Sequence, residues 1–381
     1  MSGIYIHIPF CKQACFYCDF HFSTTFKKKD ELINCLVSEI KLRKNELNTD
    51  VIQTIYFGGG TPSLLQLSEI ERIIDVVYEN HEVVANPEIT LEANPDDLTS
   101  SKIVELATSK INRLSIGIQS FFEDDLQLMN RAHNAQEAIN CLTEATHYFK
   151  NISVDLIYGI PGLSNKQWKK NIDMVLSSGI KHISSYALTV EPKTALESLI
   201  KKGIIEDVSD LQAQEQFYIL VEELSKHNFT HYELSNFAKD GAFSINNSSY
   251  WQGKSYLGIG PSAHSFDGKQ RSWNVKNNSK YISAIQQNKL PIERELLSIT
   301  DQYNEYVMTG LRTIWGVSLE KVTREFGKQY HTYLLLQSEK YIAEELLYIE
   351  DGKLKTTRKG KFLSDGISAD LFKLDMTRLQ K

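Results

Sequence analysis

The alternation of extended and helical segments in the first half of the chain most limits its possible folds. Short apolar segments suited to buried strands alternate with longer segments of helical periodicity. This order indicates parallel strands joined by crossover helices. Six such units predict a closed or partly closed barrel, although an open doubly wound sheet would give a similar pattern. The predicted strands are 4–8, 51–57, 88–92, 113–118, 152–158 and 182–188, and the predicted helices are 30–47, 68–78, 101–108, 135–149 and 166–176.

The alternation weakens after about residue 190. A helix over 211–226 and a short strand over 231–234 precede a region rich in glycine and asparagine. The final part, about 300–375, has the order helix, helix, helix, hairpin, helix, with the hairpin turning at Asp351-Gly352. This order resembles a winged helix. We therefore predict an α/β fold with a barrel over 1–235, a connecting segment over 236–300 that packs on it, and a small α+β domain over 301–375.

Charge and cysteine content narrow the possible functions. A net charge of −6 and a pI near 6.0 argue against a nucleic-acid coat, which needs a basic surface. The basic residues near the predicted hairpin lack an aromatic stripe, which favours a packing or lid role over nucleic-acid binding. No apolar run approaches the roughly 18 residues of a membrane span, and the N-terminus lacks signal-peptide features. Five cysteines, three of them clustered, do not form a secreted disulfide pattern, so we expect a cytoplasmic protein.

Polar residues mark the ends of the predicted strands. In parallel barrels the chemistry gathers at the carboxyl ends of the strands. The first strand leads into cysteines, the second into the glycine segment 58–62, the third into Glu92 and the fourth into Gln119. Asp155 lies inside the otherwise apolar fifth strand, and an ionised carboxylate is costly to bury without partners. Taken alone, Asp155 fits a structural ion pair as well as a ligand site.

Three cysteines form a metal-type motif in the segment PFCKQACFYCDFHF. Cys11, Cys15 and Cys18 are one ligand short of structural zinc, which would have to recruit His7, Asp19 or His21. A cubane [4Fe–4S] cluster takes one thiolate per iron, so three thiolates leave one iron open to an outside ligand. The spacing favours the iron–sulfur cluster over zinc, and both over three unligated thiols.

The motif CxxxCxxC after a first strand, with GGGTP after the second, resembles the radical S-adenosylmethionine superfamily. Further segments resemble the oxygen-independent coproporphyrinogen III oxidase group over nearly the whole chain. They are RLSIGIQSF, MNRAH, DLIYGIPG, YELSNFA and YLGIGPSAH. Within that group the likeness is closest to its shorter, heme chaperone branch. The resemblance implies a partial (β/α)6 radical SAM barrel followed by the small C-terminal domain of this group.

The resemblance also implies a cofactor site. S-adenosylmethionine would complete the open iron, and backbone amides of the glycine segment would hold its methionine end. The residues implied for this site are Tyr5, Tyr17, Gly59, Gly60, Thr61, Glu92, Gln119, Arg131, Asp155 and Ala187. The partner that the burial of Asp155 requires would then be the cofactor.

Two functions are compatible with this resemblance. An oxidase would cleave the cofactor and decarboxylate porphyrin propionates by radical chemistry. A chaperone would bind heme and deliver it to a respiratory hemoprotein, with possible contact at the cytoplasmic membrane surface, as a monomer or a cluster-dependent dimer. Phe20 stands where the oxidase has a further cysteine, and the strand expected at residue 4 leaves no room for the oxidase's longer N-terminal segment. Both features favour the chaperone.

One departure concerns heme. The chaperone branch has an HNxxY motif linked to heme binding, and this chain has asparagine in the histidine position. Asparagine is a poorer iron ligand than imidazole. The predicted heme region is therefore Asn246, Asn247 and Tyr250, with His264 as the first alternative ligand.

Overall fold

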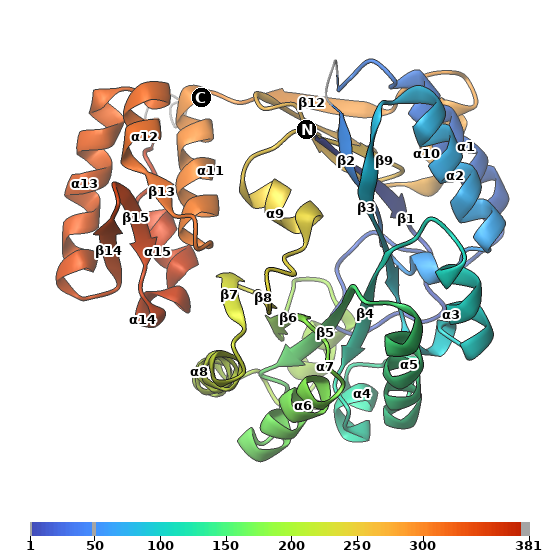
Figure 1. Ribbon diagram of the computed structural model, residues 1–381, viewed down its shortest axis with the longest axis horizontal. Helices are drawn as coiled ribbons and strands as arrows, with labels where there is room; N and C mark the ends of the chain where they lie inside the picture. Colours follow the sequence, from blue (N-terminus) through green and yellow to red (C-terminus); the bar gives the residue numbers. More distant parts are fainter. Residues whose placement is uncertain (1, 48–50, 375–381) are drawn as a thin grey trace.

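The computed structural model describes residues 2–47 and 51–374. Six parallel strands form the centre of a curved sheet, and helices cover its outer face (Figure 1). Their sequential order and pairing agree with the predicted barrel. The barrel is partial, because further strands continue the sheet beyond the first and the last of the six, and these two do not pair with each other. The central strands are β1 (Ser2–Ile8), β2 (Ile52–Gly59), β3 (Val83–Ala93), β4 (Arg113–Gln119), β5 (Ile152–Tyr158) and β6 (His182–Ala187).

The outer face of the sheet is the main hydrophobic core. Ile4, Ile6 and Ile8 alternate along β1 toward the helices and are fully buried, as expected for a strand period of two. Polar side chains at the intervening positions face the interior of the curved sheet. The covering helices are α1 (Lys29–Leu42), α2 (Leu67–Asn80), α3 (Ser100–Ala107), α4 (Glu123–Leu128), α5 (Ala135–Tyr148), α6 (Asn165–Ser177), α7 (Ala195–Lys201) and α8 (Asp210–Lys226).

The region 230–296 contributes strands at both edges of this sheet. The pair β7 (Thr230–Glu233) and β8 (Asn236–Ala238) extends it beyond β6. At the other edge β9 (Tyr256–Ile259) runs parallel to β1. The strands β10 (His264–Phe266), β11 (Gln270–Asn274) and β12 (Ile292–Leu296) continue from there, with α10 (Asn278–Ile285) packed on α1. The strand predicted over 231–234 corresponds to β7, whereas the sequence did not reveal β8 to β12, because segments of three to five residues are too short to show alternation.

A buried ion pair attaches this added edge to the barrel. Glu39 and Arg43 on α1 are almost completely buried and lie 2.9 Å apart. Arg43 Nη1 also donates to the carbonyl of Gly258 on β9 at 2.7 Å. Glu39 accepts from the Gly260 amide at 2.8 Å and from the hydroxyl of Tyr281 at 2.5 Å. Because each charge has several partners, the pair holds β9 beside β1 without leaving a buried charge unpaired.

The C-terminal part has its own hydrophobic core, and its order of elements confirms the predicted helices and hairpin. The hairpin turns at Asp351 and Gly352, both with positive φ, as a two-residue turn of this type requires. Among the described helices, none has the length and apolar character needed to cross a membrane. The elements are α11 (Ile299–Leu311), β13 (Val317–Ser318), α12 (Leu319–Phe326), α13 (Lys328–Ala343), β14 (Leu347–Glu350), β15 (Lys353–Thr356), α14 (Arg358–Lys361) and α15 (Ser364–Asp370).

Candidate functional site

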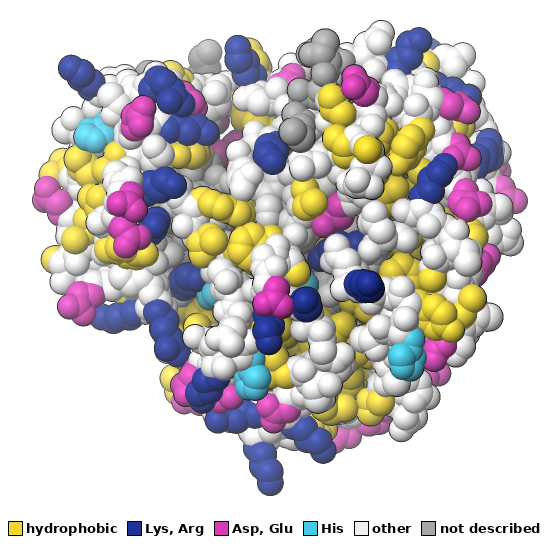
Figure 2. Space-filling model, viewed as in Figure 1, with side chains coloured by type: hydrophobic (Ala, Val, Ile, Leu, Met, Phe, Trp, Pro, Cys, Tyr) yellow, Lys and Arg dark blue, Asp and Glu magenta, His cyan; other side chains and the backbone are white. Residues whose placement is uncertain are grey.

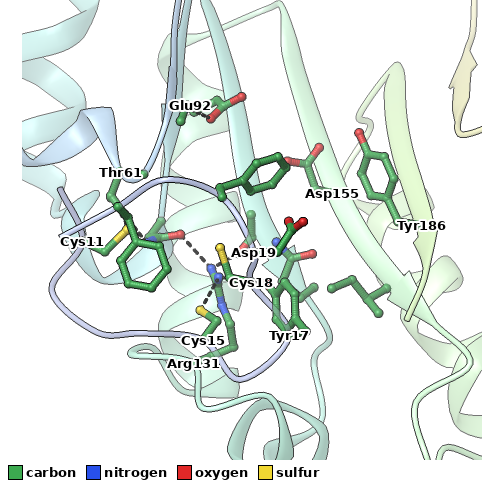
Figure 3. Close-up of a pocket in the computed structure, with 18 of the residues that line it drawn as sticks. Cys11, Cys15, Tyr17, Cys18, Asp19, Thr61, Glu92, Arg131, Asp155 and Tyr186 are labelled. Carbon is green, nitrogen blue, oxygen red and sulfur yellow. Dashed lines mark hydrogen bonds between the residues drawn. The ribbon is translucent and has the colours of Figure 1, made fainter. Parts of the chain in front are cut away.

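A pocket of about 500 Å³ lies at the carboxyl ends of the central strands. Because all six strands are parallel, the segments that follow them meet at this end of the sheet. The three clustered cysteines, the glycine segment and the polar side chains predicted for the site line this one pocket (Figure 3). The predicted residues found there are Cys11, Cys15, Tyr17, Cys18, Gly59, Gly60, Thr61, Glu92, Gln119, Arg131, Asp155 and Ala187.

The cysteine loop follows β1 directly and is held by backbone hydrogen bonds. The amide of Cys11 donates to the carbonyl of Ser23, and the amide of Ser23 donates to the carbonyl of Pro9. All three thiols are half-buried, and burial raises the pKa of Cys18 to about 11. Within residues 2–47 and 51–374, no three His, Cys, Asp or Glu side chains surround a single ion position.

Two hydrogen-bond donors lie against the thiols. The Thr61 hydroxyl donates to Cys11 Sγ at 3.5 Å, and Arg131 Nη1 donates to Cys15 Sγ at 3.4 Å. Arg131 is fixed in turn, because its Nη2 donates to the Asn94 side chain at 2.7 Å and to the Gly117 carbonyl at 2.9 Å. These donors would stabilise negative charge on sulfur.

The glycine segment passes close under the cysteine loop. Gly59 has a φ of +110°, a conformation that favours glycine. The amide of Gly60 donates to the carbonyl of Ile8 at 2.9 Å, and the amide of Thr61 donates to that of Phe10 at 2.7 Å. These hydrogen bonds therefore hold the glycine segment against the end of β1, which leads into the cysteines.

We expect Gly60→Ala to lower the free energy of unfolding by about 1–3 kcal/mol. A Cβ at Gly60 would lie 2.6 Å from the carbonyl oxygen of Phe10 and 2.8 Å from that of Ile8. Both are backbone atoms, so relief requires a shift of the cysteine loop. Urea unfolding measures the change. Gly366→Ala in α15, where an added Cβ meets nothing within 4 Å, is the matched control. A Gly60→Ala protein with the free energy of unfolding of the wild type would contradict the close approach of Gly60 to the cysteine loop.

The strand ends also hold polar groups with unused hydrogen-bonding capacity. Gln119 ends β4 with a φ of +66°, a conformation in which a non-glycine residue is strained. Its side-chain Oε1 is buried and, among the described residues, has no hydrogen-bond partner. The same holds for Arg131 Nε. Buried polar atoms normally find a partner, so these two indicate a polar ligand in the pocket.

Two carboxyl groups face the pocket interior. Burial, together with the nearby Glu92 carboxylate, raises the pKa of Asp155 to about 7, while Arg113 opposes the shift. Burial also raises the pKa of Glu92, which accepts from the Tyr56 hydroxyl at 2.8 Å and the Gly59 amide at 3.1 Å. Asp155 accepts from the Ser115 hydroxyl at 3.4 Å and from the Ser184 side chain. Because a carboxylate can accept more than two hydrogen bonds, Asp155 can also bind a ligand hydroxyl or amine in the pocket that it lines.

Several pocket residues escaped the sequence analysis. Asn94 bonds both Thr61 and Arg131, and its place two residues after Glu92 could have revealed it. Ser115 lines the pocket beside Asp155. Tyr186 also lines it, with its ring beside Asp155 (Figure 3). It precedes Ala187, but nothing in the sequence distinguishes it from a core tyrosine. Phe20, which the sequence already distinguished from the oxidase, also lines the pocket, with 68% of its surface exposed.

Tyr5 is not brought to the pocket wall. Its hydroxyl is hydrogen-bonded to His7 Nδ1 at 3.2 Å, and its ring stacks near Tyr56. The backbone of Gly58 lies against its ring edge. Tyr5 therefore packs against the glycine segment and does not line the pocket.

Of the four residues predicted for heme, Asn246, Asn247 and Tyr250 lie together on one helix, and His264 lies on β10. Asn246 lies in α9 (Ile245–Trp251) and is 3% exposed. Its Oδ1 accepts from the Thr54 hydroxyl at 2.9 Å, and its amide donates to the Glu88 carboxylate at 2.9 Å. Asn247 continues α9, and Tyr250 packs edge-on to Tyr256. His264 is exposed on β10, near Trp273. Asn246 thus fastens α9 to the inner face of the barrel.

Comparisons with known proteins agree with this architecture. Residues 5–175 match the radical SAM superfamily, and residues 297–363 match the HemN C-terminal domain. The chain is 33% identical to "Heme chaperone HemW" of Bacillus subtilis over 96% of this chain and 98% of that protein. It is 32% identical to the protein of that name from Lactococcus lactis, with the same coverage. Coproporphyrinogen III oxidase (HemN) from Escherichia coli has a similar structure, with a TM-score of 0.84, 22% identity, and coverage of 97% of this chain and 89% of that one. At that identity the likeness shows the fold alone.

Proposed function

Because this chain belongs to the HemW family of heme chaperones in the radical SAM superfamily, we propose that it binds a [4Fe–4S] cluster, S-adenosylmethionine and heme, and delivers heme to respiratory hemoproteins. The observation that carries the proposal is the meeting of three cysteines, a glycine segment and two carboxyl groups in one pocket. The family supplies the expectation of heme. We place the protein in the cytoplasm, where reduced thiols persist.

The thiols suit a cluster better than a zinc ion. Zinc needs four ligands around one position, and the described residues provide no set of even three. In a cubane each thiolate binds a different iron, so separated sulfurs in one pocket are compatible with it. Cys11, Cys15 and Cys18 would hold such a cluster, which supplies an open iron position for the amino and carboxylate groups of S-adenosylmethionine. Arg131 and Thr61 would offset the negative charge of the thiolates.

The other pocket residues would bind and orient the cofactor. Gly59 and Gly60 let the chain pass close to β1 and the cysteine loop, and their backbone lines the pocket where the methionine end would lie. Asp155 would accept hydrogen bonds from hydroxyl groups of the ribose. Gln119 would use the oxygen that is otherwise buried without a partner. The predicted division into 1–235, 236–300 and 301–375 fits this assignment, with the whole cofactor site in the first segment.

A coproporphyrinogen oxidase is the alternative function. Phe20, exposed at the pocket, stands where that enzyme group has a further cysteine. An exposed aromatic ring supplies contact area but neither a thiol nor an acid for the radical reaction. This difference favours binding of a porphyrin over its decarboxylation.

Two measurements distinguish the chaperone from the oxidase. The reconstituted protein is expected to bind hemin at about one per chain, seen as a saturable change in the hemin absorption spectrum. Given coproporphyrinogen III, S-adenosylmethionine and a reductant, it is expected to form no protoporphyrinogen IX. Turnover well above that of the Cys15→Ala protein would overturn the chaperone proposal in favour of the oxidase, and failure to bind hemin would overturn it outright.

A further inference from the structure

A second cavity, of about 440 Å³, lies between the barrel and the C-terminal domain. Its volume is within the range of small-molecule sites. On the barrel side it is lined by Val221 of α8 and by Phe229 and Phe237 beside β7 and β8. On the other side it is lined by the hairpin of β14 and β15 and by α14. None of its lining residues contributes to the cofactor pocket.

One wall of this cavity is apolar and aromatic. Phe229 and Phe237 are buried, and the ring of His231 stacks on that of Phe237 with centroids 4.0 Å apart. Tyr348, on the opposite side, is 38% exposed. Aromatic rings on two sides of the cavity favour a planar apolar ligand.

The opposite wall carries positive charge that is incompletely neutralised. Lys361 is half-buried, and burial lowers its pKa to about 8. Its Nζ donates to the carbonyl of His231 at 3.0 Å. Neither Lys361 nor Arg358 has an ion-pair partner among the described residues, whereas Lys355 pairs with Glu350 at 2.8 Å. Glu233, which attracts Lys361 from farther away, is itself paired with Arg312 at 3.2 Å. Figure 2 shows Lys and Arg side chains gathered at the edge of the C-terminal domain near α14.

The two walls are held at a fixed separation. The amide of Leu234 donates to the carbonyl of Arg312 at 2.9 Å, and the amide of Ile314 donates to that of Tyr232 at 3.0 Å. The ring of Phe362 packs against Phe217 of α8. These backbone bonds join β7 to the segment after α11, so the cavity exists without a ligand. A preformed site avoids the ordering cost of binding.

We infer that this cavity binds a planar, apolar ligand bearing two carboxylates, and that in this protein the ligand is heme. Its propionates would lie at Arg358 and Lys361, and an edge of its ring would enter between Phe229, Phe237 and Tyr348. The inference rests on the proposed heme chaperone function and identifies where in the fold the heme would bind. It also explains how heme can be held although Asn246, in place of the motif histidine, is buried and bonded to Thr54.

The test is hemin titration of the full-length protein, followed by the hemin absorption spectrum. Arg358→Gln and the double change Arg358→Gln/Lys361→Gln are expected to raise the hemin Kd by about tenfold or more, as for lost charge-assisted hydrogen bonds. Lys359→Gln is the matched control, because Lys359 lies on the same helix but donates to the carbonyl of Glu344 and does not line the cavity. It should bind as wild type. Arg358 is exposed, so its single change tests the cavity even if the double variant folds poorly.

Hemin dimethyl ester provides a second arm on the unaltered protein. It lacks the carboxylates and is expected to bind at least tenfold more weakly than hemin. Equal affinity for the ester, or an unchanged hemin Kd in Arg358→Gln and the double variant, would overturn the cavity assignment while leaving the chaperone function standing. A hemin Kd that instead rises only on Tyr250→Phe, outside this cavity, would also overturn it. No hemin binding by the wild type would overturn the proposed function itself.

Discussion

Cys15→Ala protein is expected to retain less than one iron per chain after reconstitution under conditions in which the wild type takes up about four, the number in a cubane cluster. Cys15 is one of three thiols in the pocket, and Arg131 Nη1 lies 3.4 Å from its sulfur. Loss of one of only three protein ligands leaves two irons without protein thiolates, and such a cluster is not retained. Iron analysis and the visible absorption spectrum measure the effect.

The control for this change is Cys141→Ala. Cys141 is 3% exposed within α5, on the outside of the barrel and away from the pocket. It should bind iron like the wild type, with only the stability cost of a small core cavity. Equal iron in the Cys15→Ala and wild-type proteins, or one tightly held zinc and no iron in the wild type, would show that the thiols do not hold a cluster.

Asp155→Asn is expected to stabilise the cofactor-free protein at pH 8 while weakening S-adenosylmethionine binding. Burial, with Glu92 nearby, raises the pKa of Asp155 from 3.8 to about 7. The folded state therefore binds the proton more tightly than the unfolded state. The contribution of Asp155 to the free energy of unfolding falls as the pH rises from about 4 to about 7 and is constant above that range. Asparagine does not ionise, so the variant should gain about 2–4 kcal/mol at pH 8, a range reduced for partial access of solvent to the pocket.

Urea unfolding at pH 4 and pH 8 measures this effect. The gain should vanish near pH 4, where a protonated Asp155 resembles asparagine. Asp173→Asn, at an exposed position on α6, should show no such pH-dependent gain. Calorimetry should show at least tenfold weaker S-adenosylmethionine binding by Asp155→Asn, because an amide replaces the proposed acceptor. An Asp155→Asn protein less stable than wild type at pH 8 would mean that the carboxylate is well paired in the folded state.

The barrel itself was predictable because its evidence is local. Each strand and each covering helix carries its own pattern of apolar residues, and Ile152–Tyr158 was predicted to the residue. The strands β9 to β12 were not, because their stability comes from pairing with β1 and with one another. Short segments of that kind have little pattern of their own.

The candidate site was predictable where it follows a strand in sequence. Cys11, Cys15 and Cys18 after β1 and the glycine segment after β2 fall together because parallel strands end at the same edge. Tyr5 shows the limit of this reasoning. The period of two puts it on the inner face, but only the tertiary structure places its ring behind Gly58 and not in the pocket.

The sequence by itself determined the alternation of parallel strands and helices, the cysteine loop and the glycine segment, since these depend on spacing and on neighbouring residues. Only the tertiary structure decided the environment of each polar group. It brought Glu92 near Asp155, 63 residues later in the chain, and so raised the pKa of Asp155. It buried Asn246 against Thr54 and placed Lys361 beside Phe229, His231 and Phe237 in one cavity. Burial and charge depend on everything within a few ångströms, and residues distant in sequence supply most of those neighbours.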